Sequence, residues 1–244
     1  EIDPSSLRSL TIPYPINPLH SMDFHSTQVS LRGEPVQEEV QEYLDQYRTF
    51  NLVNGLTSIN IVGVNIFNDN LKTAVLNSLE TYNKLGLRFS LELLGGYDVK
   101  TGFTNDLFVR WKYDNEINIV ISEVTGTGGR AGFPNRNGMP HDFITIGRDI
   151  EPNYGLPVAQ HVVTHEIGHC IGLRHTDYFN RSISCGKGGN EHREQMSIGI
   201  GAQHRPGTPV QADLNSVMLA CYNSDNTGNL SDFDKVALIN IYRD

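Results

Sequence analysis

The sequence lacks the features of a membrane-spanning protein and of a nucleic-acid-binding protein. No stretch of its 244 residues approaches the roughly 20 consecutive apolar residues that a membrane-spanning helix needs. Its 19 Lys and Arg residues are outnumbered by 28 Asp and Glu residues, which gives a formal net charge of -9. Nucleic acids are bound through clustered Lys and Arg side chains, which displace counterions. We therefore expect neither a transmembrane segment nor a nucleic-acid partner.

Cysteine is scarce, and a secretion signal is missing. The three cysteines, Cys170, Cys185 and Cys221, allow one disulfide with one thiol left over. Spacing does not determine the pairing, and we favour Cys185 with Cys221. No charged start followed by an apolar segment is present. Because the chain begins with Glu1 and not with Met, we expect that a signal was removed and that the protein is secreted or held at the cell surface.

The first fifth of the chain differs from the rest. Five of the eleven prolines lie before residue 36, and proline removes amide donors and fixes φ. We expect residues 1–50 to form an N-terminal arm, either a pro-segment or a lid, and residues 51–244 to form the catalytic domain. Within the arm, apolar residues at helical spacing behind a proline predict a helix over 34–47.

Beyond the arm, apolar patterns alternate between the period of strands and the period of helices. Asn68 or Asp69 can cap one helix, Pro157 is a favourable first-turn residue of another, and Ser231 with Asp234 forms a capping pattern for the last. Residues 125–140 are rich in turn formers and predict a loop. The expected strands cover 58–67, 87–93, 117–121 and an edge strand at 141–147; the expected helices cover 68–85, about 158–171 and 231–241.

The segment HEIGH at 165–169 carries the clearest chemistry. His165 and His169 are four residues apart, so both imidazoles lie on one face of a helix and can reach one ion. Gly172 allows the chain to turn out of the helix, and His175 can then return as a third ligand. Three protein ligands leave one coordination position open, which is typical of catalytic zinc. We predict one Zn²⁺ here.

Glu166 lies next to the first of these ligands. Zinc lowers the pKa of water beside it to about 7, so a carboxylate is a sufficient base. We predict that Glu166 acts as general base towards the attacking water and then passes the proton to the departing amine. This predicts hydrolysis without a covalent enzyme intermediate.

The complete string HEIGHCIGLRH over 165–175 resembles the extended zinc-binding motif of the metzincin metallopeptidases. Members of that clan carry a methionine turn downstream, and residues 216–218, ending in Met218, are similar to it. The segments HEIGHCIGLRHTDYFNRS, HRPGTP and NSVMLACY most resemble the bacterial dual-action HEIGH metallopeptidases. The resemblance covers roughly residues 45–244.

The resemblance implies an α+β, metzincin-like zincin fold. It implies a twisted mixed β-sheet packed on two long helices, followed by a smaller irregular C-terminal subdomain that ends in a helix. The substrate would lie in a cleft bordered by the edge strand, because an exposed sheet edge pairs with the main chain of any extended peptide. The expected function is that of a zinc-dependent endopeptidase acting on proteins or peptides.

One tyrosine and one histidine near the motif need separate consideration. Where astacin-like and serralysin-like metzincins have a tyrosine near the metal, this chain has Ala220. Tyr222 is then a candidate transition-state stabiliser, but we favour a tyrosine of the core or rim. His161 lies in line with the two helical ligands. Three stacked histidines would span about 12 Å along a straight helix, so they cannot all bind one ion. We expect His161 to be a capping or hydrogen-bonding residue.

Other readings stay open. Residues 223–229 loosely resemble a calcium loop with Asp234 as its closing ligand, so Ca²⁺ is a secondary prediction beside that of a polar turn. The arm could cover the cleft and offer Asp23, His25 or Glu34 to the metal. The alternative functions are a non-catalytic zinc-bearing binding module and a zinc hydrolase of a non-peptide substrate. A binding module would have no reason to retain Glu166. Cleavage preference and oligomeric state are not encoded in any pattern we recognise.

Overall fold

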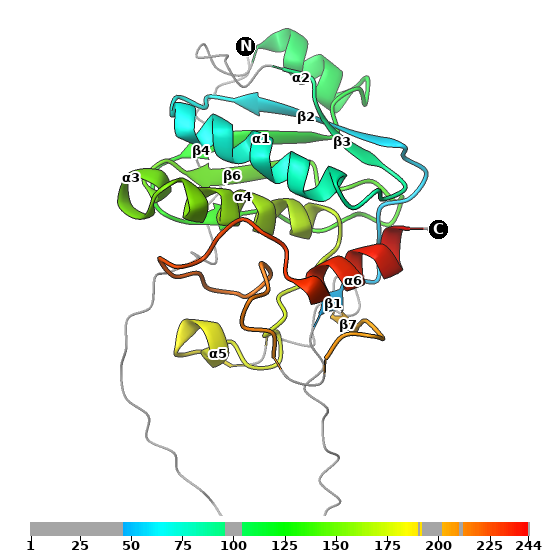
Figure 1. The fold of residues 1–244 in the computed structure, drawn as a ribbon. Coiled ribbons are helices and arrows are strands. Elements are labelled where there is room, and N and C mark those ends of the chain that lie inside the picture. The colour runs from blue at the N-terminus through cyan, green and yellow to red at the C-terminus, as the bar shows by residue number, and fades with distance from the viewer. Residues whose placement is uncertain (1–45, 96–103, 190, 192–201, 210–211, 244) are drawn as a thin grey trace, which may run out of the picture.

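The computed structural model describes residues 46–95, 104–189, 191, 202–209 and 212–243. Within them, a five-stranded sheet forms the upper half of the molecule (Figure 1). Four strands are parallel, and the last one in the sheet, β5, is antiparallel to its neighbour β6. In spatial order the strands are β3 (Ser90–Leu93), β2 (Ser58–Val64), β4 (Ile119–Val124), β6 (Phe143–Gly147) and β5 (Gly129–Arg130).

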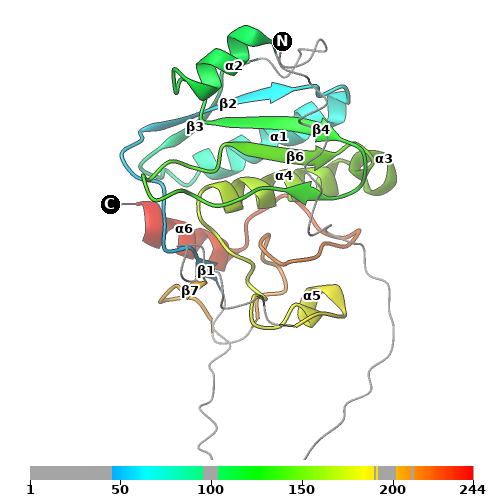
Figure 2. The ribbon, with the colours of Figure 1, turned by 180° about the vertical axis from the view of Figure 1, so that it is seen from behind.

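Two long helices, α1 (Asp69–Asn83) and α4 (Leu156–Cys170), cover one face of this sheet. Figures 1 and 2 show them side by side on that face. Asn68 caps α1 by accepting hydrogen bonds from two backbone amides, as predicted. The hydroxyl of Tyr82 in α1 donates to the carbonyl of Thr164 in α4 over 2.7 Å. The two helices and the sheet enclose the main hydrophobic core, which confirms the predicted mixed sheet on two long helices.

Three shorter helices are not predicted by the sequence pattern: α2 (Asn105–Lys112), α3 (Ile150–Tyr154) and α5 (Ser182–Cys185). They have eight, five and four residues, which is too few for a helical period to show clearly. The first of them, α2, contributes Leu107 to a second apolar cluster, which also contains Val62 and Val120 of the sheet. Strands β2 and β4 are therefore apolar on both faces.

Below α4 the chain is irregular, as expected for the C-terminal part. It contains the short antiparallel pair β1 (Tyr47–Arg48) and β7 (Gln203–His204) and ends in α6 (Asp232–Tyr242) (Figure 1). Ser231 and Asp234 form the predicted capping box. Cys185 and Cys221 form a disulfide, which confirms the favoured pairing, and Cys170 is free and buried.

One predicted edge strand is wrong. The strand expected at 141–147 is β6, and it lies inside the sheet between β4 and β5. The edge is formed by Gly129–Arg130, within the segment predicted as a loop. Its glycines hide the strand period, but the amide of Gly147 donates to the carbonyl of Gly128 over 2.7 Å and holds this segment on β6.

The described end of the arm packs on the rest of the chain. Tyr47 belongs to β1, so the helix predicted over 34–47 is wrong at its C-terminal end; residues 34–45 lie outside the described residues. The amide of Thr49 donates to the carbonyl of Gly172 over 2.8 Å. The predicted metal-facing residues of the arm at 23, 25 and 34 also lie outside the described part, so the latency segment and the boundary at residue 50 stay predictions.

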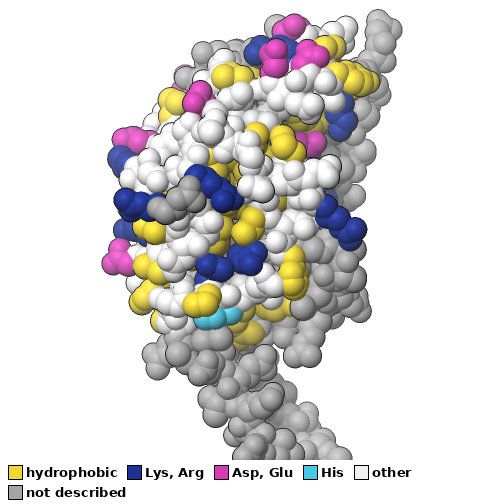
Figure 3. All heavy atoms as spheres, turned by 90° about the vertical axis from the view of Figure 1, so that its right-hand side faces the viewer, with side chains coloured by type: hydrophobic (Ala, Val, Ile, Leu, Met, Phe, Trp, Pro, Cys, Tyr) yellow, Lys and Arg dark blue, Asp and Glu magenta, His cyan; other side chains and the backbone are white. Residues whose placement is uncertain are grey.

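The described part of the chain contains no helix that is both long and apolar enough to cross a membrane. Figure 3 shows one face of the molecule, on which Lys and Arg side chains lie among hydrophobic ones. The absence of a nucleic-acid partner stays a prediction.

Candidate active site

The zinc-motif residues lie where α4 ends and the chain turns back. Gly172 adopts a φ of 105°, which is a left-handed conformation that favours glycine. The amide of Leu173 donates to the carbonyl of Gly168, and the amide of Gly172 donates to that of His169. This pair of bonds is a Schellman motif, the usual way in which a glycine ends a helix. The turn brings His175 back towards the helix.

The three predicted ligands converge. The Nε2 atom of His175 lies 3.2 Å from Nε2 of His165 and 3.2 Å from Nε2 of His169. Among the described residues, these three are the one group of His, Cys, Asp or Glu side chains that could hold a metal ion, with their ligand atoms within 4.8 Å of one another. The first two are buried, and His175 is partly buried.

The hydrogen-bond partners of the opposite ring nitrogens fix the tautomers of the two buried imidazoles. Nδ1 of His165 lies 2.8 Å from the carbonyl of Val217, and Nδ1 of His169 lies 2.8 Å from the carbonyl of Leu173. A carbonyl only accepts, so both Nδ1 atoms carry the proton and both Nε2 atoms present lone pairs. Nδ1 of His175 faces the carboxylate of Glu191 in the same way.

Lone pairs that point at one another repel unless a cation lies between them, so this arrangement fits a metal ion. Burial, followed by the neighbouring imidazoles, lowers the pKa of His165 well below its usual value. Burial and His175 lower the pKa of His169 to about 3. Both rings are therefore neutral at physiological pH, which is the form that binds metals. The residues present fit the zinc that the motif predicts.

Glu166 lies beneath the edge strand. Its side chain is buried, and burial raises its pKa to about 8, opposed by a hydrogen bond from the backbone of Ala131. A Cβ atom on Gly129 of β5 would lie 2.4 Å from Oε1 of Glu166, so this carboxyl group fits only because residue 129 is glycine. The edge strand and the acidic side chain of α4 are therefore in direct contact.

Met218 lies against the opposite side of the zinc helix. It is fully buried, and a Cβ atom on Gly168 would lie 2.6 Å from its sulfur. Asp234 of α6 holds the preceding residues: the Ser216 hydroxyl donates to it over 2.7 Å, and the Val217 amide over 2.8 Å. The last helix thus fixes the turn whose carbonyl orients the first histidine ligand.

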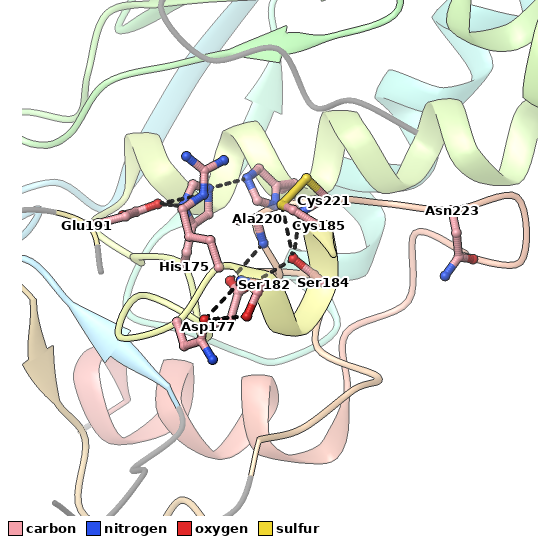
Figure 4. The surroundings of a disulfide bond; sticks show 12 residues. His175, Asp177, Ser182, Ser184, Cys185, Glu191, Ala220, Cys221 and Asn223 are labelled. Atoms are coloured by element: carbon pink, nitrogen blue, oxygen red, sulfur yellow. Dashed lines mark hydrogen bonds and ion pairs between the residues drawn. A yellow bond between two sulfur atoms is a disulfide. The ribbon is translucent and has the colours of Figure 1, made fainter. Parts of the chain in front are cut away.

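A second set of contacts ties this turn to the segment that follows the third histidine. Asp177 accepts hydrogen bonds from the amide of Ala220 over 2.9 Å and from the hydroxyl of Ser184 over 2.5 Å. The amide of Cys221 in turn donates to Ser184, next to the disulfide (Figure 4). The disulfide therefore closes a network that begins two residues after His175.

Two residues considered from the sequence take part in hydrogen bonds with main-chain carbonyls. Nδ1 of His161 lies 3.0 Å from the carbonyl of Thr227, and His161 is not part of the imidazole cluster, which confirms its hydrogen-bonding role. The hydroxyl of Tyr222 donates to the carbonyl of Thr127 over 2.7 Å. In this structure the Tyr222 hydroxyl is thus bonded to the loop that precedes the edge strand.

The secondary prediction of calcium gains no support. The side-chain oxygens of Asn223 and Asn226 accept hydrogen bonds from backbone amides inside the loop, which makes the segment a polar turn. Asp234, the expected closing ligand, is instead bonded to the methionine turn and to the cap of α6. No second metal-binding group occurs among the residues that the structure describes.

Sequence reasoning missed several residues of the site. Glu191 and Asp177 follow the motif without a recognisable spacing, and their partners are set by the irregular lower region. Gly129 lies in a segment with many glycines, so its special role could not be singled out. The one available signal was Asp234, whose capping pattern was recognised but whose bonds to the methionine turn were not.

Fold and site together define a metallopeptidase, in which a mixed sheet lies over a helix that carries a three-imidazole cluster with a buried carboxyl group beside it. The chain belongs to the dual-action HEIGH metallo-peptidase family, whose model matches residues 22–242. The predicted family is thereby confirmed, and the protein is a metallopeptidase. No curated protein matches the chain.

Solved structures resemble it at low sequence identity. One is myroilysin, with 13% identity and a TM-score of 0.46, covering 79% of this chain and 82% of that one. Another is high choriolytic enzyme 1, a hatching enzyme zinc-protease from Oryzias latipes (medaka fish), with 16% identity and a TM-score of 0.43. That match covers 79% of this chain and 92% of the hatching enzyme.

Proposed function

We propose that the protein is an endopeptidase in which His165, His169 and His175 hold a catalytic zinc ion and Glu166 is the general base. The observation that carries this proposal is the convergence of three Nε2 lone pairs on one point. Zinc bound there would polarise the scissile carbonyl and acidify the attacking water. Three protein ligands leave room for both partners.

The surroundings of Glu166 suit a group that takes up a proton and then releases it. The Glu166 carboxyl group is buried next to His165, where a carboxylate would accept a proton from water and return it to a leaving amine. The backbone hydrogen bond from Ala131 holds the carboxyl group in place. A binding module without catalysis would gain nothing from a buried acid at this point.

The edge strand supports a peptide as substrate. Among the strands of the described part, β5 lies at the edge of the five-stranded sheet, which is the position where an extended peptide adds to a sheet. Such pairing uses main-chain groups, which every peptide offers. Because β5 contacts Glu166, a bound peptide would lie across the metal site. The Tyr222 hydroxyl could stabilise the transition state only after leaving the carbonyl of Thr127.

The disulfide supports a secreted or cell-surface location. Disulfides persist in oxidising compartments and are rare in the cytosol. The Cys185–Cys221 bond lies in the irregular region, which has few regular elements of its own. In the oxidising environment outside the cell, this disulfide would stay intact.

Casein hydrolysis by Glu166→Gln tests the mechanism. We expect kcat to fall about 10²- to 10⁴-fold, as is usual when a general base is lost, while about one zinc per chain is retained. Glu116→Gln, at a glutamate exposed to solvent, is the matched control and should leave activity unchanged. Unchanged cleavage by Glu166→Gln would eliminate the mechanism. Full zinc content in His175→Ala would eliminate the ligand assignment.

A further inference from the structure

We propose that Glu191 is a positioning residue for the third metal ligand and holds the His175 ring in the orientation that directs Nε2 at the metal. The inference rests on the proposed function, because it assumes that His175 is a ligand. Its basis is an asymmetry among the three histidines. Two of them are oriented by main-chain carbonyls, whereas His175 is oriented by a side chain sixteen residues further along the chain.

His175 needs this support more than the other two. His165 and His169 lie on one helix, so their backbone positions are fixed by the helical hydrogen bonds of α4. His175 lies beyond the glycine that ends the helix, and its side chain is 15% exposed. A free imidazole on such a segment could rotate about χ1 and χ2. A fixed acceptor at Nδ1 removes that freedom and also selects the tautomer.

Glu191 is itself held firmly. Its amide donates to the carbonyl of Tyr178 over 2.9 Å, which fixes its backbone beside the histidine. Its Oε2 atom accepts from Arg174 over 2.7 Å, and its Oε1 atom lies 3.6 Å from Nε of Arg181. Figure 4 shows the carboxylate directed towards the His175 side of the site. Oε2 therefore bonds to Arg174, whereas Oε1 faces Nδ1 of His175 and lies near Arg181.

The charge on Glu191 is maintained by those partners. Two arginine side chains flank its carboxyl group, one bonded to Oε2 and one 3.6 Å from Oε1, and their positive charges favour the carboxylate form. A carboxylate accepts a stronger hydrogen bond than a carbonyl, and it makes the imidazole a better metal ligand.

The competing explanation is that Glu191 only neutralises Arg174. That guanidinium is almost fully buried, lies over the rings of Phe133 and Tyr178, and needs an anionic partner. The two roles differ in what they require of the side chain. Neutralising Arg174 requires a charge, whereas orienting His175 requires an acceptor atom at Nδ1. Glutamine supplies the acceptor without the charge, and alanine supplies neither.

The test measures zinc affinity on the full chain. Zinc is removed with a chelator, and the dissociation constant is measured by competition with a chromophoric chelator for wild type, Glu191→Gln and Glu191→Ala. We expect affinity to fall about 10- to 100-fold in Glu191→Ala, the usual loss when such a partner is removed, and less in Glu191→Gln. Glu80→Ala is the matched control, because it removes an exposed glutamate of α1 that pairs with Lys84. Its affinity should stay near that of wild type.

Two further readouts separate positioning from stability. Thermal unfolding of each metal-free variant measures the structural effect alone, and the visible absorption of the Co²⁺-loaded protein reports the ligand geometry. A changed cobalt spectrum in Glu191→Ala, with the fold intact and with a spectrum like that of wild type in Glu191→Gln, would support positioning. Affinities within twofold of wild type in both Glu191 variants, with only the unfolding temperature lowered, would overturn it. Failure of wild type itself to bind zinc would overturn the proposed function instead.

Discussion

At the scale of single residues, the site depends on two glycines whose missing side chains make room for others. Gly129 leaves space for the Glu166 carboxyl group, and Gly168 leaves space for the Met218 sulfur. Neither role follows from the conformational freedom of glycine, because neither residue has a positive φ. Both follow from close packing, in which a single added carbon atom has to displace a neighbour.

Gly129→Ala should therefore impair catalysis while leaving zinc binding intact. The new Cβ atom would lie 2.4 Å from Oε1 of Glu166 and 2.6 Å from Cγ1 of Val162, so the carboxyl group has to move. We expect kcat/KM on a peptide substrate to fall at least about 10-fold, because even small displacements of a catalytic group are costly. Gly189→Ala, where nothing lies within 4 Å, is the matched control. Equal activity of the two variants would contradict the contact.

Gly168→Ala should destabilise the fold even though alanine favours helices. Its Cβ atom would lie 2.6 Å from the Met218 sulfur and 3.0 Å from the Tyr82 hydroxyl, inside the core. Overpacking of this kind costs about 1–3 kcal/mol, which exceeds the roughly 1 kcal/mol gained in helix propensity. The free energy of unfolding measured in urea checks the sign. A more stable variant would contradict this prediction and would show that the Met218 side chain can move away from the new Cβ atom at little cost.

The residues of the site were predictable where chemistry requires a fixed spacing. The three histidines and Glu166 were identified because a helix and a glycine bend determine how they can meet. Glu191 was not, because its distance along the chain from His175 depends on the path of an irregular segment. Local rules do not describe such a path, and nothing in the sequence around Glu191 distinguishes it from a surface glutamate.

At the scale of elements, helix α6 acts on the site through one side chain. Asp234 accepts a hydrogen bond from the Ser231 amide within the cap and further bonds from Ser216 and Val217 of the methionine turn. The end of the chain thus helps to place the carbonyl that orients His165. Asp234 serves both the cap and the turn, whereas Ser231 serves the cap alone, so mutation of each residue separates the two roles.

Two substitutions in this cap should have different effects. Ser231→Ala removes the cap hydrogen bond alone and should cost about 1 kcal/mol of unfolding free energy. Asp234→Ala also leaves the hydroxyl and amide of the turn without their acceptor, at about 1–3 kcal/mol for each buried group. Urea unfolding and zinc competition together check this prediction: only Asp234→Ala should weaken zinc binding. Equal losses in the two variants would assign Asp234 to the cap alone.

Elements were predictable where the period was long enough to be clear. Helices α1 and α6 have side-chain caps, α4 has a proline in its first turn, and β2, β3 and β4 carry apolar runs or alternation, so each was expected close to its place. Strand β5 was missed because its two residues carry no period at all. It forms because its backbone pairs with the side of β6 that does not face β4, and this side is defined only once the sheet has assembled.

At the scale of the whole molecule, the disulfide cross-links two parts of the irregular lower region, and the metal ligands join that region to α4. Reduction of Cys185–Cys221 frees a connection of 36 residues that includes the methionine turn. We expect a loss of about 2–4 kcal/mol in unfolding free energy, the usual range for a native disulfide. Unfolding with and without a reductant measures it. Cys170 is buried and free, so Cys170→Ser in the presence of zinc should not remove the effect of the reductant.

Removal of zinc should also lower the unfolding temperature. A ligand that binds only the native state stabilises it by about 2.7 kcal/mol at a concentration 100 times its dissociation constant. Calorimetry of the holo and chelator-treated protein checks this, and adding zinc back should restore the original value. Identical transitions would mean that the metal site contributes nothing to stability.

The hydrogen bonds between the β1 segment and the bend after α4 set a limit on how far the N-terminus can be shortened. Tyr47 accepts a hydrogen bond from the Arg174 amide, and Thr49 donates to Gly172, so these residues form a clasp around the bend that delivers His175. A protease that cuts before Gln46 would leave the clasp closed. A cut after Phe50 would separate these two residues from the domain, and we expect zinc affinity, measured by competition with a chromophoric chelator, to fall although every ligand remains in the chain.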